Sequence, residues 1–296
     1  MTEKAYLSAS PCGLSARLSV LGFLFVVIST GAMFSPVFAQ DSASQSNSSD
    51  MTLRQREVAK QRLRLASLDV EERRDAVLRL GWMNHAESSR IAATALADTA
   101  PIVRAIAAHA VLALPSEEAV ALLVPLLKDK KEFVRREAAY ALGETRSTTA
   151  VDALVNVLQG DKQPSVRGAA AVALGVVADE RAAYYLARTI DPGFPVAAYD
   201  DHKGKKEKDH FVLRSAARSL GQIRSHAPVP ALVAALTNER FNDDVRHEAA
   251  FSLGLIGDIA AVPALKAAQE AHDPYLSSMA FEALVKIARH DSSVTR

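Results

Sequence analysis

Residues 134–143 read VRREAAYALG, and this stretch decides the fold because versions of it recur along most of the chain. The copies begin at positions 72, 103, 134, 166, 212, 245 and 276, so successive starts are 31, 31, 32, 46, 33 and 31 residues apart. A nearly constant period of this length is typical of proteins in which each repeat is one unit of supersecondary structure. The sequence therefore predicts a repeat architecture with one insertion, inside the 46-residue step.

Each copy predicts a pair of helices. In the first half, apolar residues such as Val134, Ala138 and Leu142 recur on one helical face. In the second half, apolar residues recur three and seven positions after Val151. One pair cannot bury its apolar faces alone, so neighbouring pairs must stack. We expect Gly143 and its counterparts to end the first helices, because glycine readily adopts the left-handed conformation.

These units resemble HEAT repeats, specifically the short variety shared with phycobilisome lyases and deoxyhypusine hydroxylase, over about residues 62–290. The expected fold class is all-α: an α-solenoid, a right-handed superhelix of about seven HEAT-like helical hairpins. We assign 61–290 as the repeat domain, with a loop insertion at 191–210 and a C-terminal tail at 291–296. Abundant small and aliphatic residues favour such helix packing. The resemblance implies a protein-binding module in most cases and an enzyme in a few.

The N-terminus has the pattern of an export signal. Arg17 precedes an apolar run from Leu18 to Phe34, and the small-residue pattern Val37-Phe38-Ala39 follows. This order is that of a secretory signal peptide. We therefore assign 1–39 as a signal peptide, expect cleavage after Ala39, and predict a periplasmic or secreted protein. The alternative is an uncleaved membrane anchor, since the run is about as long as a marginal membrane-spanning helix.

Charge and cysteine content exclude several functions. The net charge is +1, and removal of residues 1–39 leaves 33 basic and 33 acidic residues. A balanced chain has no long-range attraction for nucleic acid, so no nucleic-acid partner is expected. The sole cysteine, Cys12, lies in the predicted signal, which leaves no thiolate ligand or cysteine nucleophile. Residues 40–60 are expected to be a disordered Ser-rich linker running into the first helix.

An Asp and an Arg recur at fixed positions, and in the resembling family such residues form a ladder that links successive repeats. The structural ladder residues here are Asp98, Arg104, Asp129, Arg135, Asp161 and Arg167. We expect each Arg to join a carboxylate and unpaired backbone groups at the turn between helices. The alternative is a basic stripe for an acidic ligand. Leu213 and Ser277 replace the Arg in later copies, so the C-terminal repeats are expected to stack less regularly.

The pair His247-Glu248 resembles the iron-ligand motif of deoxyhypusine hydroxylase. That chemistry needs several such pairs, because two irons require many nitrogen and oxygen ligands. The corresponding positions of the other copies hold no second pair. We therefore expect a protein that is not an enzyme, without catalytic residues, metal site or cofactor, and we interpret His247 as an ordinary helix-surface residue.

The insertion is the candidate binding surface, because insertions in solenoids map to one face, often the binding face. It reads DPGFPVAAYDDHKGKKEKDH and is expected to be a mobile charged loop. The candidate protein-binding residues are Tyr184, Tyr185, His202, Lys203, Lys205, Lys206 and Lys208. The alternative for the loop is a solvated decoration. We interpret Trp82 as a cap over the N-terminal end of the core.

The predicted function is thus a non-catalytic protein-binding scaffold, exported to the periplasm or outside the cell. Its partner is a protein of unknown identity, with membrane contact only if the N-terminal segment stays uncleaved. The alternative is a metal-dependent or lyase-type enzyme, or an enzyme accessory, built on the same repeat and retaining one His-Glu pair.

Overall fold

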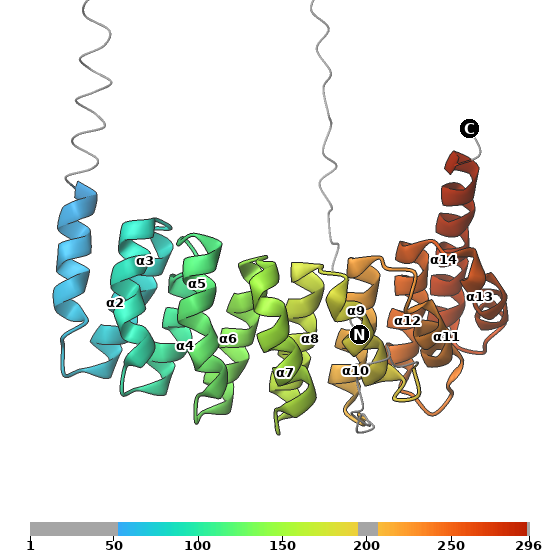
Figure 1. The fold of residues 1–296 in the computed structure, drawn as a ribbon, viewed down its shortest axis with the longest axis horizontal. Coiled ribbons are helices and arrows are strands. Elements are labelled where there is room, and N and C mark those ends of the chain that lie inside the picture. Colours follow the sequence, from blue (N-terminus) through green and yellow to red (C-terminus); the bar gives the residue numbers. More distant parts are fainter. Residues whose placement is uncertain (1–52, 195–206, 295–296) are drawn as a thin grey trace, which may run out of the picture. The chain divides into compact units, whose positions relative to one another are not determined.

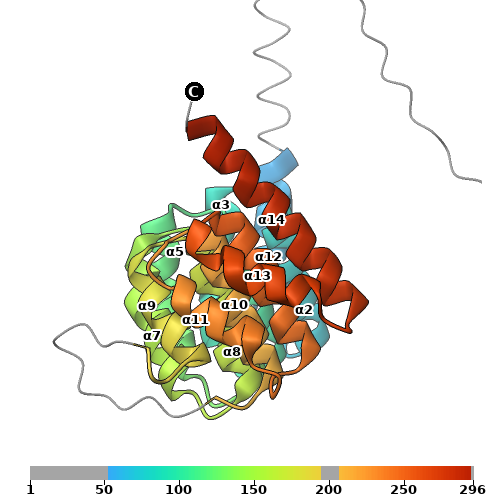
Figure 2. The same ribbon diagram turned by 90° about the vertical axis from the view of Figure 1, so that its right-hand side faces the viewer.

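The computed structural model describes residues 53–194 and 207–294, with side chains up to His290. Every regular element in these ranges is helical, and the helices stack side by side in a row (Figure 1). Figure 2 looks along the row, with the first helices α8, α10 and α12 on one side and the second helices α7, α9 and α11 on the other. The prediction of an all-α solenoid is confirmed.

The helices follow one another as first and second members of pairs. The pairs are α2 (Val70–Trp82) with α3 (Ala86–Ala92), α4 (Pro101–Ala110) with α5 (Ser116–Leu123), α6 (Glu132–Glu144) with α7 (Val151–Gly160), α8 (Pro164–Val177) with α9 (Arg181–Ile190), α10 (His210–Ile223) with α11 (Val229–Thr237), and α12 (Asp243–Ile256) with α13 (Val262–Gln269). Short 3-10 helices are η1 (Ala93–Ala97), η2 (Val124–Lys128), η3 (Thr148–Ala150) and η4 (Ile259–Ala261). The seventh copy contributes one long helix, α14 (Pro274–Val294), to the described residues.

A further helix spans residues 53–64 and precedes the first pair. It begins inside the segment 40–60 that the sequence assigned as linker. The predicted signal peptide lies outside the described residues, as does the central part of the insertion, residues 195–206. No helix in the part of the chain that the structure describes is both long and apolar enough to cross a membrane.

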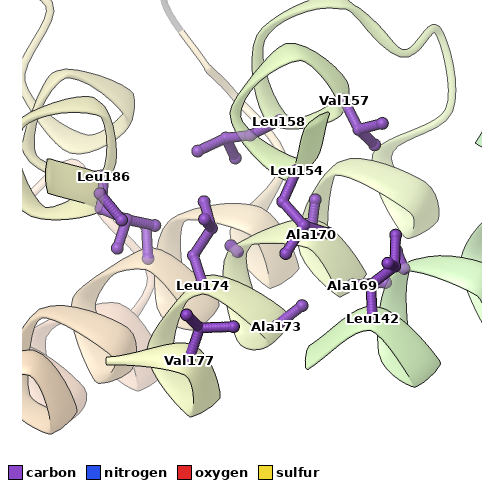
Figure 3. Close-up of a cluster of buried hydrophobic side chains, with 14 of the residues drawn as sticks. Leu142, Leu154, Val157, Leu158, Ala169, Ala170, Ala173, Leu174, Val177 and Leu186 are labelled. Carbon is purple, nitrogen blue, oxygen red and sulfur yellow. The ribbon is translucent and has the colours of Figure 1, made fainter. Parts of the chain in front are cut away.

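The core is a continuous layer of leucine, valine and alanine between the two rows of helices. Around α8, the side chains of Leu142, Leu154, Leu174 and Leu186 come from four successive helices and belong to one buried cluster (Figure 3). All four are completely buried. Burial of one leucine stabilises a fold by about 1.5–3 kcal/mol, so the stack gains stability with each added pair.

The glycine that ends five of the seven sequence copies lies inside a helix, so the prediction that it ends the helix is wrong. A Cβ atom on Gly143 would lie 2.7 Å from the Cα atom of Ala173 in the next first helix. Equivalent contacts below or near 3 Å join Gly81 to Ala110, Gly175 to Ser219, Gly221 to Ser252 and Gly254 to Ala283. Glycine is therefore required because two helices approach closely at this point, and the small residue six positions after the Arg position of the next copy provides the facing surface.

The left-handed residue of each turn lies three positions after this glycine. It is Asn84 after α2, Arg146 after α6, Ala178 after α8, Arg224 after α10 and Gly257 after α12, with φ values of 45°, 53°, 58°, 57° and 82°. In four of these five turns a residue other than glycine adopts the left-handed conformation, because the flanking helices are already fixed by packing. The sequence pattern alone did not show whether the repeat glycine allows two helices to pack closely or ends its own helix.

Candidate binding and catalytic sites

The recurring arginines connect neighbouring repeats at the N-terminal ends of the first helices. Arg104 donates from Nε and Nη2 to the carboxylate of Asp129 in the next repeat, at 2.7 and 2.9 Å. Its Nη1 donates to the backbone carbonyl of Asp98, in the turn before its own helix, at 2.7 Å. One guanidinium therefore joins a turn with an otherwise unsatisfied carbonyl to the neighbouring repeat.

Four such contacts follow one another, and we call this set the Arg ladder. It consists of the pairs Arg73–Asp98, Arg104–Asp129, Arg135–Asp161 and Arg167–Glu207, each with a shortest nitrogen–oxygen distance of 2.7 Å. The hydrogen bond from Arg73 lowers the pKa of Asp98 below its ordinary value, and this outweighs the opposing effect of burial. The side chains are mostly buried, so these are not solvent-exposed ion pairs of negligible strength.

Glu207 was missed by the sequence reasoning, which assigned it to the charged insertion. It lies 40 positions after Arg167, whereas Asp161 lies 26 positions after Arg135. Its carboxylate also accepts the backbone N–H groups of Lys208 and Asp209, and Asp209 caps α10. Glu207, which follows the insertion, thus plays the part for Arg167 that Asp161 plays for Arg135. The available sequence signal was an acidic residue two positions before Asp209, the N-cap of the next first helix.

The Arg ladder stops after the insertion. Leu213 stands at the Arg position of α10 and is buried. Arg246 in α12 donates to the backbone carbonyl of Leu236 at 3.1 Å, and its nearest carboxylate, that of Asp243, lies 3.8 Å away on the same helix. Ser277 bonds to the carbonyl of Gln269. Arg246 and Ser277 thus keep the contact to a backbone carbonyl before their helix, Leu213 does not, and none of the three forms a ladder pair with a carboxylate in the described residues.

A second row of contacts links repeats at the opposite ends of the first helices. Its links are Arg90 to Glu118, Ser147 and Thr149 to Glu117, Arg181 to the carbonyl of Thr148, Ser225 to Glu180, and His226 to Asp258. This second row continues into the C-terminal repeats. No recurrent residue type marks it, which is why the sequence did not reveal it.

His247 and Glu248 lie on α12 but make separate contacts. His247 Nε2 bonds to the Asp273 carboxylate, at the start of α14, and its ring lies 6.3 Å from that of Tyr275. Glu248 lies 3.9 Å from the guanidinium of Arg218 on α10. Burial raises the pKa of Glu248, and the charge of Arg218 only partly offsets this effect. The interpretation of His247 as an ordinary surface residue is wrong, because it is partly buried and paired.

No group of three or more His, Cys, Asp or Glu side chains within residues 53–194 and 207–290 is arranged to hold a metal ion. A second histidine contact occurs on the same face of the first helices, where His109 Nε2 lies 3.1 Å from Glu137. His109 Nδ1 lies 3.7 Å from Glu144. These contacts again join a first helix to its neighbour, α4 to α6.

The two tyrosines of the predicted binding surface form an aromatic cluster at the base of the insertion. The rings of Tyr184 and Tyr185 meet edge to face with centroids 5.3 Å apart, and Phe194 lies 6.3 Å from Tyr184. The buried guanidinium of Arg188 lies over the Tyr184 ring, 5.7 Å from its centroid. Lys208 is exposed next to α10. His202, Lys203, Lys205 and Lys206 lie outside the described residues.

Trp82 does not cap the core, contrary to our interpretation. Its side chain ends α2 and is 77% exposed. The N-terminal end of the core is instead covered by the helix of residues 53–64, through the buried Val58 and Gln61. A tryptophan next to a repeat glycine could equally pack inward or outward, and only the position of the preceding helix decided this.

Family models identify the repeats on both sides of the insertion. HEAT repeats match residues 58–143 and 131–197, and the PBS lyase HEAT-like repeat matches residues 212–238 and 245–271. The chain contains HEAT repeats. The division between the two models coincides with the insertion, and also with the end of the Arg ladder.

One curated relative and two solved structures illustrate the similarity. Deoxyhypusine hydroxylase-B of Oryza sativa subsp. japonica is 43% identical over 65 residues, 22% of each chain, so this HEAT protein matches about a fifth of the relative's length. The Escherichia coli protein YibA is 19% identical with a TM-score of 0.55, covering 79% of this chain and 82% of that one. The CpcE–CpcF complex of phycocyanin lyase from Nostoc sp. PCC7120 is 24% identical with a TM-score of 0.46, covering 78% and 86%.

The prediction that the protein is not an enzyme is contradicted by the curated relative. Deoxyhypusine hydroxylase-B is an enzyme by name. Our reasoning counted His-Glu pairs, and a count of pairs addresses only the iron site of one enzyme. Catalysis by other groups, or by a HEAT chain together with a second subunit, was not addressed by that count.

Proposed function

We propose that this HEAT-repeat chain binds a protein partner along its stacked helices and serves an enzyme reaction of the hydroxylase or lyase class as an accessory subunit. The observation that carries the proposal is the linkage of successive repeats at both ends of the first helices. The Arg ladder spans the N-terminal repeats, and the second row of contacts extends from α3 to η4. Repeats held in register present a preformed surface, which lowers the conformational cost of binding.

The enzyme class rests on the curated relative. The match to deoxyhypusine hydroxylase-B reaches 43% identity over 65 residues, about two repeats. Repeats of one fold serve many functions, so this similarity supports an association with enzyme chemistry and does not by itself give the reaction.

The partner surface is proposed at the aromatic cluster of Tyr184, Tyr185 and Phe194. Both tyrosines are partly exposed on α9, and the buried guanidinium of Arg188 contacts the ring of Tyr184. Tyrosine provides a large contact area with a polar tip and few rotatable bonds, which is why it is enriched in protein interfaces. The exposed Lys208 adds a positive charge just before α10, the helix that packs against α9, so we propose that the bound segment of the partner includes an acidic residue.

Site-specific crosslinking in the native source tests this proposal. A photoreactive amino acid at Tyr185 is expected to capture one defined protein, and the same group at the exposed Gln159 of α7 serves as the control. The activity of the captured enzyme is then measured with and without the HEAT chain. Identical products from both positions, or an unchanged activity, would contradict the proposal.

A second candidate function is direct catalysis at α12, which a specific observation favours. Glu248 is buried with a raised pKa, and the adjacent His247 is oriented by Asp273. A carboxyl group with a raised pKa and an oriented imidazole are suited to general acid and base roles. If the chain itself is catalytic, Glu248→Gln should lower turnover about 100-fold or more without weakening partner capture. Glu137→Gln, at the equivalent position of α6, is the matched control.

Export is part of the same proposal. The charged start, apolar run and Val37-Phe38-Ala39 pattern support a cleaved signal peptide. N-terminal sequencing of the protein from its native source is expected to begin at Gln40. A sequence that begins at Met1 or Thr2 in a membrane fraction would support the anchor instead.

A further inference from the structure

The helix of residues 53–64 carries a concentration of positive charge that the balanced charge of the whole chain conceals. It contains five basic residues and one acidic residue, Glu57. The side chains of Arg54, Arg56, Lys60 and Arg62 are exposed. None of the four takes part in an ion pair or side-chain hydrogen bond with the described residues. The only acidic residue of the helix accepts a hydrogen bond from Gln61 at 2.5 Å.

Leucines lie among these charges on the outward face. Val58 and Gln61 are buried against the first repeat, so the opposite face of the helix points away from the stack. Positions 53, 56, 60 and 63 recur at helical spacing on that face. Leu53 is 60% exposed and Leu63 is 77% exposed, while Leu68 in the following turn is fully exposed. These three leucines, within sixteen residues, are not buried by any part of the chain that the structure describes.

We infer that the outward face of this helix docks the protein on an anionic phospholipid surface. Basic side chains contact the headgroups, while leucines on the same face enter the boundary between headgroups and acyl chains. Nucleic acid would account for the charge but would leave the leucines exposed. The sequence adds a second reason, because only 18 residues, 35–52, separate the helix from the apolar run that ends at Phe34. Before cleavage, a segment of that length keeps the helix within about 60 Å of the membrane.

Vesicle co-sedimentation of residues 40–296, which include every described residue, tests the inference. The protein is expected to bind vesicles of phosphatidylcholine mixed with phosphatidylglycerol, and to remain in solution with phosphatidylcholine alone. Binding should weaken as salt is raised, because screening reduces the attraction between the headgroups and the basic side chains. Equal binding to both vesicle types, or binding to neither, would overturn the inference, and so would retention by duplex DNA without retention by the anionic vesicles.

Charge reversal separates the helix from a general effect of net charge. Arg56→Glu with Lys60→Glu should reduce the partition coefficient at least 25-fold, at about five-fold for each basic group removed. The control is Arg240→Glu with Lys266→Glu, which makes the same change of charge at exposed positions of the C-terminal repeats. Neutral variants, Arg56→Gln with Lys60→Gln, replace the reversal if it impairs folding. Leu63→Ser should also weaken binding, and most clearly at high salt. Equal losses in the helix variant and the control would count against a specific surface.

Discussion

The repeats before and after the insertion use the same helix packing but different polar links. In both regions a repeat glycine faces a small residue of the next first helix, with a Cβ atom that would lie 2.7 Å from backbone at Gly143 and at Gly254. Only the N-terminal region adds an Arg ladder pair, in which a guanidinium donates two hydrogen bonds to one carboxylate, at each repeat boundary up to Arg167–Glu207. Close packing is therefore the common requirement of the stack, and the Arg ladder is an addition to it. The C-terminal repeats show that stacking proceeds without a carboxylate at that position.

Removal of one ladder arginine is the strongest way to test this difference. Arg135→Ala leaves the mostly buried carboxylate of Asp161 without its cation and should lower the free energy of unfolding by about 3 kcal/mol. Arg246→Ala, its counterpart in α12, removes a hydrogen bond to a backbone carbonyl and should cost only about 1 kcal/mol. Denaturant titration of both variants measures the two values. Equal costs would show that the ladder carboxylates add no stability.

Substitution of the repeat glycines tests what the two regions share. Gly143→Ala and Gly254→Ala should each lower the free energy of unfolding by about 1–3 kcal/mol, because the added methyl group meets helix backbone. Gly160→Ala is the control, because no atom lies within 4 Å of the added Cβ. It should be neutral or stabilise the protein by up to about 1 kcal/mol. A large difference between Gly143→Ala and Gly254→Ala would mean that the two regions are packed differently after all.

Acid should loosen the N-terminal repeats before the C-terminal ones. The pKa of Asp98 is lowered in the folded protein, first by the hydrogen bond from Arg73, so its contribution is complete above the unfolded pKa of about 3.9. The contribution is lost as the pH falls through the lower, folded pKa. Hydrogen exchange measured as the pH falls below about 4 should show earlier loss of protection in α2 and α4 than in α12, by about 1 kcal/mol or less. Simultaneous loss in all three helices would contradict this order.

The smallest effect is expected at Glu248. Its pKa is raised by burial, so its stabilising contribution is present below the unfolded pKa of about 4.3 and is lost as the pH rises through the folded pKa. At neutral pH the folded protein therefore bears the cost of a buried charge. Glu248→Gln should raise the free energy of unfolding by up to about 1 kcal/mol at pH 7 and change it little at pH 4. Destabilisation at pH 7 would mean that the contact with Arg218 outweighs burial.

The sequence predicted the elements more reliably than the roles of particular residues. Spacing identified the helix pairs, because an apolar face recurs with the helical period in every copy. The role of the repeat glycine was predicted wrongly, since a helix end and a close contact between two helices both favour the residue without a side chain. Glu207 and the second row of contacts were missed, because their partners lie 30 or more positions away and carry no repeated motif. The pairing of His247 was not predicted, because Asp273 becomes its partner only when α14 packs against α12.

The sequence by itself determined the all-α repeat architecture, the number of copies and the position of the insertion, because each depends on local periodicity. Tertiary structure alone decided which helix backbones touch at the glycines and where the Arg ladder ends. It also decided which side chains of the helix of residues 53–64 remain exposed. These features depend on the distance and orientation between neighbouring repeats. Those quantities are fixed by packing across residues that are far apart in the chain, so no local pattern contains them.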